Sequence, residues 1–183
     1  ASRMLAVVAF VALLPAFLIA ANASLVINTP PLYSYGFSKY RDQISYYLDI
    51  SDDELRSAGG QIRDYFNNDE DLNVRVVQGG VLRSIIDTER EVLHMKDVKG
   101  LVRGTYWVQW LTGAYLVAFS VIGLVSARRR LLPRLGRYAG LGGAVTIGLV
   151  LVVGLASLFG FERLFLAFHL VSFSNDLWQL DPS

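Results

Sequence analysis

Three long apolar runs without a charged residue constrain this chain more than any other feature of its sequence. They are Met4 to Ile27, Gly104 to Val125 and Tyr138 to Phe161. A helix needs about 20 apolar residues to cross the hydrocarbon core of a bilayer. Inside lipid, only helices and closed barrels satisfy every backbone polar group. The sequence therefore predicts an α-helical polytopic membrane protein with three spanning helices, at residues 4–27, 104–125 and 138–161.

The first run has an alternative interpretation as a cleaved signal peptide. Ala21-Asn22-Ala23 has the small-residue pattern of a signal-peptidase site. The apolar run, however, continues past that site and is longer than the apolar core of a signal peptide. We therefore interpret residues 4–27 as a retained helix.

The loop at residues 126–137 predicts which way the chain is inserted. Short loops rich in lysine and arginine stay on the cytoplasmic side. The loop has five arginines and no acid: Arg128, Arg129, Arg130, Arg134 and Arg137. Residues 28–103 and 162–183 are then extracytoplasmic. Tyr106, Trp107 and Trp110 fall at the opposite interface, as an aromatic belt.

Residues 28–103 are predicted to form a small α+β domain. Ser51 and Glu54 form a capping box that starts an amphipathic helix. Alternating apolar residues on both sides of Gln78-Gly79-Gly80 predict a β-hairpin. Thr88 and Glu91 form a second capping box. A helix that starts there is expected to run into the second span without a break.

The chain has two histidines, and the predicted topology puts both outside, near the membrane surface. On a helix, Glu91, His94 and Asp97 share a face, and a carboxylate one turn away can accept a ring proton from the imidazole. The alternative is a solvent-exposed helix on which the histidine has no functional role. If the helix after the third span continues, Asp176 falls on the face of His169. The alternative there is an interfacial segment that ends in a turn.

Several classes of function are excluded or disfavoured by what the sequence lacks. The absence of cysteine excludes disulfides, thiolate metal sites and a cysteine nucleophile. There is no nucleophile elbow, phosphate loop or zinc-protease motif. Without a basic tail or stripe, nucleic-acid binding is not expected. A zinc site made by His94, Asp97, His169 and Asp176 remains an alternative. Two histidines can otherwise act as acid and base if the substrate brings its own nucleophile.

Two stretches of the sequence are similar to the signatures of a known family. "TEREVLHMKDVKGL" and "FHLVSFSNDLWQLDP" resemble the signature stretches of the bacterial lipoprotein intramolecular transacylases. The similarity covers essentially the whole chain. Members of this family continue beyond the second stretch into a fourth span. The sequence, which starts at Ala1 without a methionine, is therefore interpreted as a fragment that lacks the last span.

The resemblance implies an enzyme of the bacterial cell membrane. The sn-2 acyl chain of a diacylglyceryl-modified N-terminal cysteine would move to the α-amine of that cysteine, giving the lyso form without a cofactor. The implied partners are diacylglyceryl lipoproteins of the outer leaflet and membrane lipids. The implied catalytic residues are His94, His169, Asp97 and Glu91, and the implied substrate-binding residues are Asn175, Asp176, Arg90 and Lys96. The alternatives are a non-catalytic membrane protein of this fold that binds lipid or a partner, and a metal-dependent membrane hydrolase.

Overall fold

The computed structural model describes residues 2–42, 50–86, 88–127 and 132–179. Its contacts divide the chain into two units. We call Ala1–Ser24 with Gly104–Ser172 the bundle, and Leu25–Arg103 with Phe173–Ser183 the small domain. Arg128, Arg129 and Arg130 of the predicted loop, and the Leu-Asp-Pro end of the second signature stretch, lie outside the described residues.

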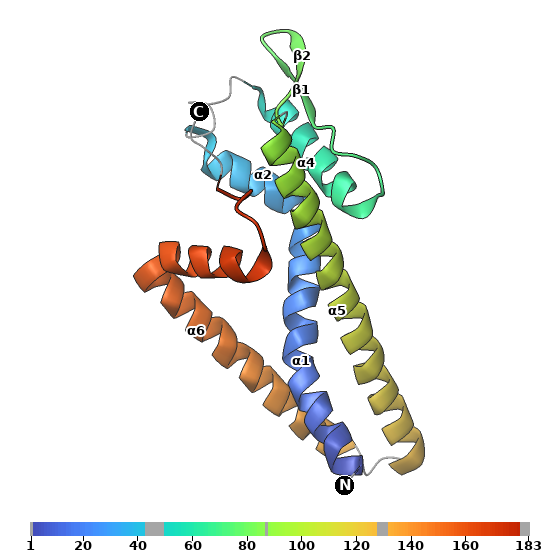
Figure 1. The fold of residues 1–183 in the computed structure, drawn as a ribbon. Helices are drawn as coiled ribbons and strands as arrows, with labels where there is room; N and C mark the ends of the chain where they lie inside the picture. The colour runs from blue at the N-terminus through green and yellow to red at the C-terminus, as the bar shows by residue number, and fades with distance from the viewer. Residues whose placement is uncertain (1, 43–49, 87, 128–131, 180–183) are drawn as a thin grey trace. The chain divides into compact units, whose positions relative to one another are not determined.

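The bundle contains three helices that are long and apolar enough to cross a membrane, which confirms the predicted fold class. They are α1 (Ser2–Ile27), the later part of α5 (Glu89–Ala127) and α6 (Leu132–Ser172) (Figure 1). Large apolar side chains face outward on α5 and α6, among them Trp107, Trp110 and Ile147. A helix that is apolar all round is typical of a membrane span.

Small residues let the bundle helices approach one another closely. A Cβ on Gly142 of α6 would lie 2.8 Å from Leu14 of α1, and a Cβ on Gly113 of α5 would lie 3.0 Å from Phe17. Glycines at helix contacts are typical of membrane proteins. The glycine-rich third run had predicted this kind of packing, and Gly142 confirms it. At the other glycines of the run, a Cβ would meet nothing within 4 Å among the described residues: Gly140, Gly143, Gly148 and Gly154.

Helix α6 is interrupted at Gly160, whose φ of −173° and ψ of 56° are not helical. The interruption falls within one residue of the predicted end of the third span. Figure 1 shows the sharp change of direction between the orange and red parts of α6. The part after Gly160 is a separate helical segment, and it carries His169.

The small domain is built around helix α4 and a β-hairpin. It comprises α2 (Pro30–Lys39), α4 (Asp52–Asn67), β1 (Arg75–Gln78), β2 (Val81–Ser84) and the start of α5. The N-cap half of the predicted capping box is confirmed, because the hydroxyl of Ser51 accepts a hydrogen bond from the backbone N–H of Glu54. The Glu54 carboxylate accepts instead from the backbone N–H of Val77 on β1, at 2.9 Å. The core cluster has five buried members: Ile50, Leu55, Ala58, Val74 and Val76.

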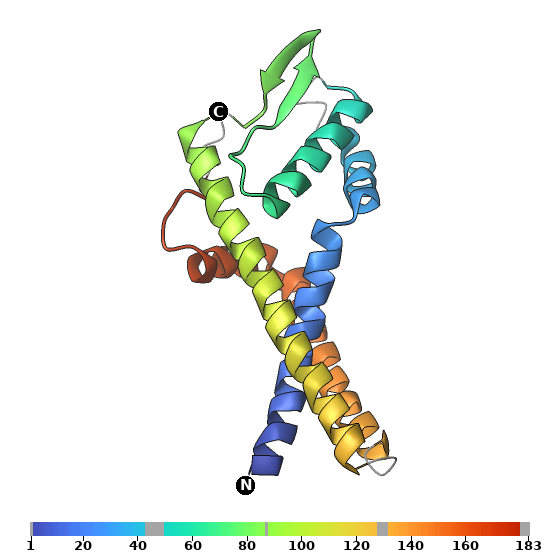
Figure 2. The same ribbon diagram turned by 90° about the vertical axis from the view of Figure 1, so that its right-hand side faces the viewer.

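The predicted hairpin is confirmed. Strands β1 and β2 pair antiparallel, with Gln78 opposite Val81 (Figure 2). The two residues between them, Gly79 and Gly80, have φ of 58° and 79°. A two-residue hairpin turn of this kind requires positive φ at both positions, which glycine adopts at no steric cost. The side chain of Gln61 on α4 bonds both the N–H and the C=O of Arg75, at 2.9 and 2.8 Å, and so holds the hairpin to the helix.

Helix α5 begins at the second predicted capping box. The carboxylate of Glu91 accepts hydrogen bonds from the hydroxyl and the N–H of Thr88, at 2.7 and 3.2 Å. The helix then runs to Ala127 without interruption, as the sequence predicts. One continuous helix therefore carries both the His94 face and the second span.

Candidate functional site

One face of the start of α5 carries Arg90, His94 and Asp97, at positions i, i+4 and i+7. Each of these side chains contacts the short segment Phe173–Asp176, which we call the strap. The strap follows the end of α6 and belongs to the small domain. His94 is thus placed between two other polar side chains that hold the same segment.

The ring of His94 packs edge-on against Phe173, with 5.3 Å between ring centroids. Phe173 is buried, with 8% of its surface exposed. Edge-to-face aromatic pairs prefer this geometry. The Nδ1 atom of His94 is also buried. Phe173 therefore limits how the imidazole can turn.

Hydrogen bonds tie the strap to α5 on both sides of His94. Asn175 Nδ2 donates to Asp97 Oδ2 at 2.8 Å. Arg90 Nη2 donates to the backbone oxygen of Asp176 at 2.5 Å and lies 3.9 Å from its Oδ2. Three of the predicted substrate-binding residues, Arg90, Asn175 and Asp176, are thus engaged in contacts within the chain itself.

The two carboxylates predicted beside His94 have different surroundings. Glu91 is bonded to Thr88 at the start of the helix. Asp97 accepts its hydrogen bond from Asn175 on the strap. Asp97 is therefore linked, through the strap, to the ring that packs on His94.

His169 is buried in the last part of α6, with 9% of its surface exposed. Its Nδ1 lies 2.8 Å from the backbone oxygen of Phe165. The rings of Phe165 and Phe168 pack on it, with centroids at 4.0 and 5.2 Å. A carbonyl oxygen only accepts hydrogen bonds, so Nδ1 carries a proton. In the neutral ring, the basic lone pair is then on Nε2.

The prediction that Asp176 shares a helix face with His169 is wrong. Helix α6 ends at Ser172, and Asn175 and Asp176 lie in the bends that follow it. The Asn175 side chain accepts a hydrogen bond from the N–H of Leu177 at 3.1 Å, a local turn contact. Asparagine and serine favour such turns over helix. His169 belongs to the bundle, whereas Asp176 belongs to the small domain.

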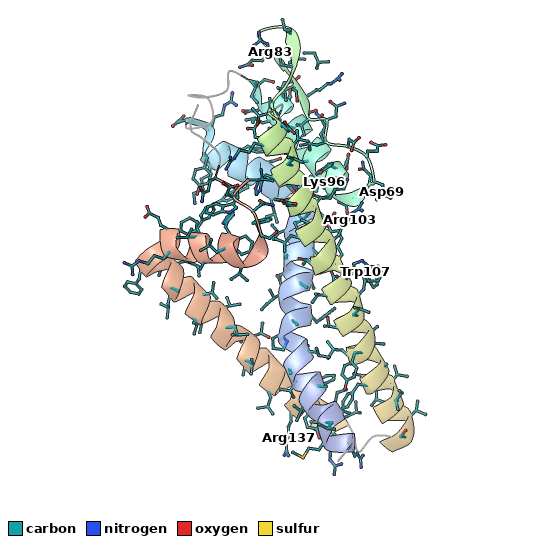
Figure 3. All side chains as sticks on the ribbon, in the orientation of Figure 1. Asp69, Arg83, Lys96, Arg103, Trp107 and Arg137 are labelled. Carbon is teal, nitrogen blue, oxygen red and sulfur yellow. The ribbon has the colours of Figure 1, made fainter. Side chains whose placement is uncertain are left out.

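Lys96, the fourth predicted substrate-binding residue, is exposed at the edge of a cavity of about 370 Å³. Figure 3 shows it with Arg103 on α5 and with Asp69 on the facing loop. Arg103 Nη2 lies 2.7 Å from Asp69 Oδ1 and also donates to the backbone oxygen of Asn68. The hydrogen bond from Arg103, and then its charge, lower the pKa of Asp69.

Lys99 holds the same loop from inside this cavity. Its Nζ donates to the backbone oxygen of Glu70 at 2.9 Å and lies 3.9 Å from the ring centroid of Tyr65. A cation over an aromatic face is attracted by the ring quadrupole. Burial raises the pKa of Tyr65, and the charge of Asp71 adds to this shift. The phenol is therefore protonated at neutral pH.

The predicted metal alternative lacks support in the geometry. Among the residues that the structure describes, no group of three or more His, Asp or Glu side chains is placed to hold a metal ion. The zinc set that the sequence allowed included Asp176, which is not on the helix of His169.

Sequence reasoning missed Phe173, Lys99 and Arg103. No local pattern distinguished Phe173 from the other apolar residues around it. A signal existed for the two bases, because Lys96, Lys99 and Arg103 recur at helical spacing just before the second span.

Together, the three apolar helices, the small α+β domain and the strapped histidine define a polytopic integral membrane protein with a polar site on the first turns of α5. The chain belongs to the lipoprotein intramolecular transacylase family, whose model matches residues 8–183. Members of this family are acyltransferases that act on lipoproteins.

Solved structures agree with this assignment of the fold. The lipoprotein intramolecular transacylase Lit from Bacillus cereus matches with a TM-score of 0.80 at 20% identity, over 100% of this chain and 79% of that one. Two variants of that protein, with a histidine replaced by alanine or by arginine, match with TM-scores of 0.70 and 0.69 at 21% identity. Both comparisons cover 98% of this chain, and 74% and 73% of the respective variant. Comparison with curated proteins found no match.

Proposed function

We propose that this protein transfers the sn-2 acyl chain of a diacylglyceryl-modified N-terminal cysteine to the α-amine of the same cysteine. The observation that carries the proposal is the family match over residues 8–183. The product is a lyso-form lipoprotein with an amide-linked acyl chain. Nucleophile and acyl donor are on one molecule, so the chain needs no nucleophile of its own, which agrees with its lack of cysteine and of a nucleophile elbow.

In this proposal His169 supplies the base and His94 supplies the acid. The α-amine has a reference pKa of about 7.7–8.0, so it must lose a proton before it attacks the ester carbonyl. His169 presents a basic Nε2, because its Nδ1 donates to Phe165. We assign it the role of base, and we assign His94 the role of acid. The ammonium proton leaves to solvent before attack. As the C–N bond forms, His169 takes a second proton from the nitrogen, and as the ester C–O bond breaks, His94 gives a proton to the glycerol oxygen. His169 then releases its proton and His94 takes one up, so over the cycle one proton moves from nitrogen to oxygen.

The purified protein in liposomes with a synthetic diacylglyceryl lipopeptide tests the reaction. Substrate and product are isomers, so intact mass does not distinguish them. We expect a fragment ion that carries the acyl chain on the N-terminal residue, and loss of reactivity toward amine reagents. A hydrolase would instead release fatty acid and leave the amine reactive. A non-catalytic binding protein would leave the lipopeptide unchanged, and either result would contradict the proposal.

We further propose that Arg134 and Arg137 face the cytoplasm and that both histidines act at the outer leaflet. The support is the excess of arginine at residues 126–137. The natural lack of cysteine allows a clean test with Asp52→Cys and Arg137→Cys. In intact cells, a membrane-impermeant maleimide is expected to label Asp52→Cys only, and Arg137→Cys is expected to react after permeabilisation. The reverse pattern would overturn the orientation.

We propose that the strap positions His94. Asp97 supports His94 in two ways: it holds the strap through Asn175, and its negative charge stabilises the protonated imidazole. Asn175→Ala breaks the bond to Asp97 but keeps the carboxylate. We expect it to lower the turnover number about tenfold, the loss that goes with about 1.4 kcal/mol of transition-state stabilisation, at every pH. Asp97→Asn removes the charge as well. A nearby carboxylate stabilises a protonated imidazole. The rate falls as the general acid loses its proton, so the basic limb of the pH–rate profile should move to lower pH in this variant.

The pH–rate profiles of wild type, Asn175→Ala and Asp97→Asn between pH 5 and pH 9 separate the two roles. Arg63→Gln is the matched control, since Arg63 forms its ion pair with Asp64 on the same helix, α4, and not with the strap. It should behave like wild type. If the basic limb has the same midpoint in Asp97→Asn as in wild type, the role of Asp97 is limited to holding the strap.

A further inference from the structure

A second cavity, of about 290 Å³, lies within the bundle at the end where α5 stops and α6 starts. Helices α1, α5 and α6 all contribute to its wall. Two arginines line it, Arg3 from α1 and Arg134 from the first turn of α6. Two hydroxyl residues, Ser126 and Tyr138, line it as well. Basic residues from two different helices therefore lie at this cavity, together with two residues that carry hydroxyl groups.

The parts of α1, α5 and α6 that line this cavity contain no acidic residue. The sequence contains no Asp or Glu before Asp42, and none between Asp97 and Glu162. All of the bundle up to Phe161 is therefore free of carboxylates, while Arg137 adds further positive charge at this end. The bundle segments beside Arg3 and Arg134 therefore supply no carboxylate to pair with them, and a bound anion would supply that charge. Guanidinium groups match phosphate oxygens in geometry and charge.

The rest of the cavity is apolar. Val7, Phe119 and Ile122 line it. The ring of Phe119 is fixed from both sides, by Phe10 at 4.8 Å and by Tyr138 at 6.5 Å between centroids. Ile122 is 65% exposed, so the apolar floor continues outward onto the surface of α5. A free phosphate ion would leave this floor uncovered, whereas an acyl chain beside a phosphate would cover it.

We propose that this cavity binds an anionic phospholipid of the leaflet at the arginine-rich end of the bundle. The phosphodiester lies between Arg3 and Arg134, and one acyl chain covers Phe119 and Ile122. Basic pockets between membrane helices are a recognised type of site for anionic headgroups. The lipid joins α1 to α6, the two helices that carry the arginines. This site is separate from the histidines, and its occupation does not depend on the proposed reaction.

Native mass spectrometry of the purified chain, titrated with phosphatidylglycerol or with phosphatidylcholine, tests the proposal. Wild type is expected to retain phosphatidylglycerol selectively. Each basic residue near an anionic lipid surface strengthens binding about fivefold, so Arg3→Gln with Arg134→Gln should weaken it about thirtyfold. Val7→Phe keeps both charges but fills the floor, and it should also weaken retention.

Arg137→Gln is the matched control. Arg137 lies in α6 at the same end of the bundle (Figure 3), three residues from Arg134, and does not line the cavity. This variant is expected to keep at least a fifth of the wild-type affinity. Equal retention of the two lipids by wild type would overturn the proposal. A loss as large for Arg137→Gln as for the double variant would also overturn it, because the attraction would then be that of a diffuse positive surface. All four substitutions replace side chains at the cavity or the surface, and a melting curve for each confirms that the fold is intact.

Discussion

His169→Ala and His94→Ala are each expected to lower the rate of acyl transfer at least a hundredfold, with normal protein levels. General acid–base catalysis by a positioned side chain contributes about 10² to 10⁴ in rate. The base at the amine and the acid at the glycerol oxygen act together in one reaction. Loss of either is expected to remove most of the benefit of both, so the double variant should be little worse than either single variant. The measurement is the rate of N-acylation of the lipopeptide, followed by the N-terminal fragment ion.

His169→Asn separates catalysis from structure at this position. The Asn amide can still donate to the backbone oxygen of Phe165, as Nδ1 of His169 does, but it has no basic nitrogen. We expect this variant to melt like wild type and to be as inactive as His169→Ala. Activity close to wild type in any of these variants would show that the substituted histidine is not catalytic. Recovery in His169→Asn alone would limit His169 to its contact with Phe165.

Gly142→Leu is expected to destabilise the bundle by about 1–3 kcal/mol. A Cβ at this position would lie 2.8 Å from Cδ2 and 3.0 Å from Cβ of Leu14, and 3.2 Å from the backbone oxygen of Val11. The tip of the leucine can rotate away, but its Cβ and the carbonyl cannot move unless α1 shifts. The substitution therefore pushes α6 away from α1.

Gly143→Leu is the matched control for this prediction. It makes the same chemical change one residue along the same helix, where a Cβ would meet nothing within 4 Å. Both variants gain the helix propensity of leucine over glycine, so the difference between their melting temperatures in detergent reports the packing alone. Equal melting temperatures would show that α1 and α6 do not pack closely at Gly142 in the folded protein.

Local sequence signals predicted the three spans, α4, the hairpin and the start of α5, but not the short helix α2. A run of apolar residues identifies a span because lipid leaves the backbone no other partner than its own helix. The N-cap at Ser51, the capping box at Thr88 and the Gly79–Gly80 turn were also correct. Each depends on residues no more than a few positions apart, so the sequence contains all the information required. The family resemblance, carried by the two signature stretches, was confirmed by the family match over residues 8–183.

Contacts between distant residues could not be predicted in this way. Periodicity does not reveal where a helix stops when an apolar segment continues, so Asp176 was assigned to a helix that ends at Ser172. The glycine-rich run likewise predicted close packing, but only a neighbouring helix decides which glycine is used, and that is Gly142. Sequence analysis found the polar residues of the candidate site but could not tell which of them bond to each other.

By itself, the sequence determined the spans, the caps, the hairpin and the family, because these depend on local chemistry or on a stretch of characteristic residues. The tertiary structure alone decided that Asn175 bonds Asp97, 78 residues away, and that Arg90 bonds Asp176, 86 residues away. It also decided that Phe173 packs on His94. A contact across such a separation forms only when the whole domain has brought both segments to one place. The surroundings of an imidazole, and hence its use as acid or base, are set by those contacts.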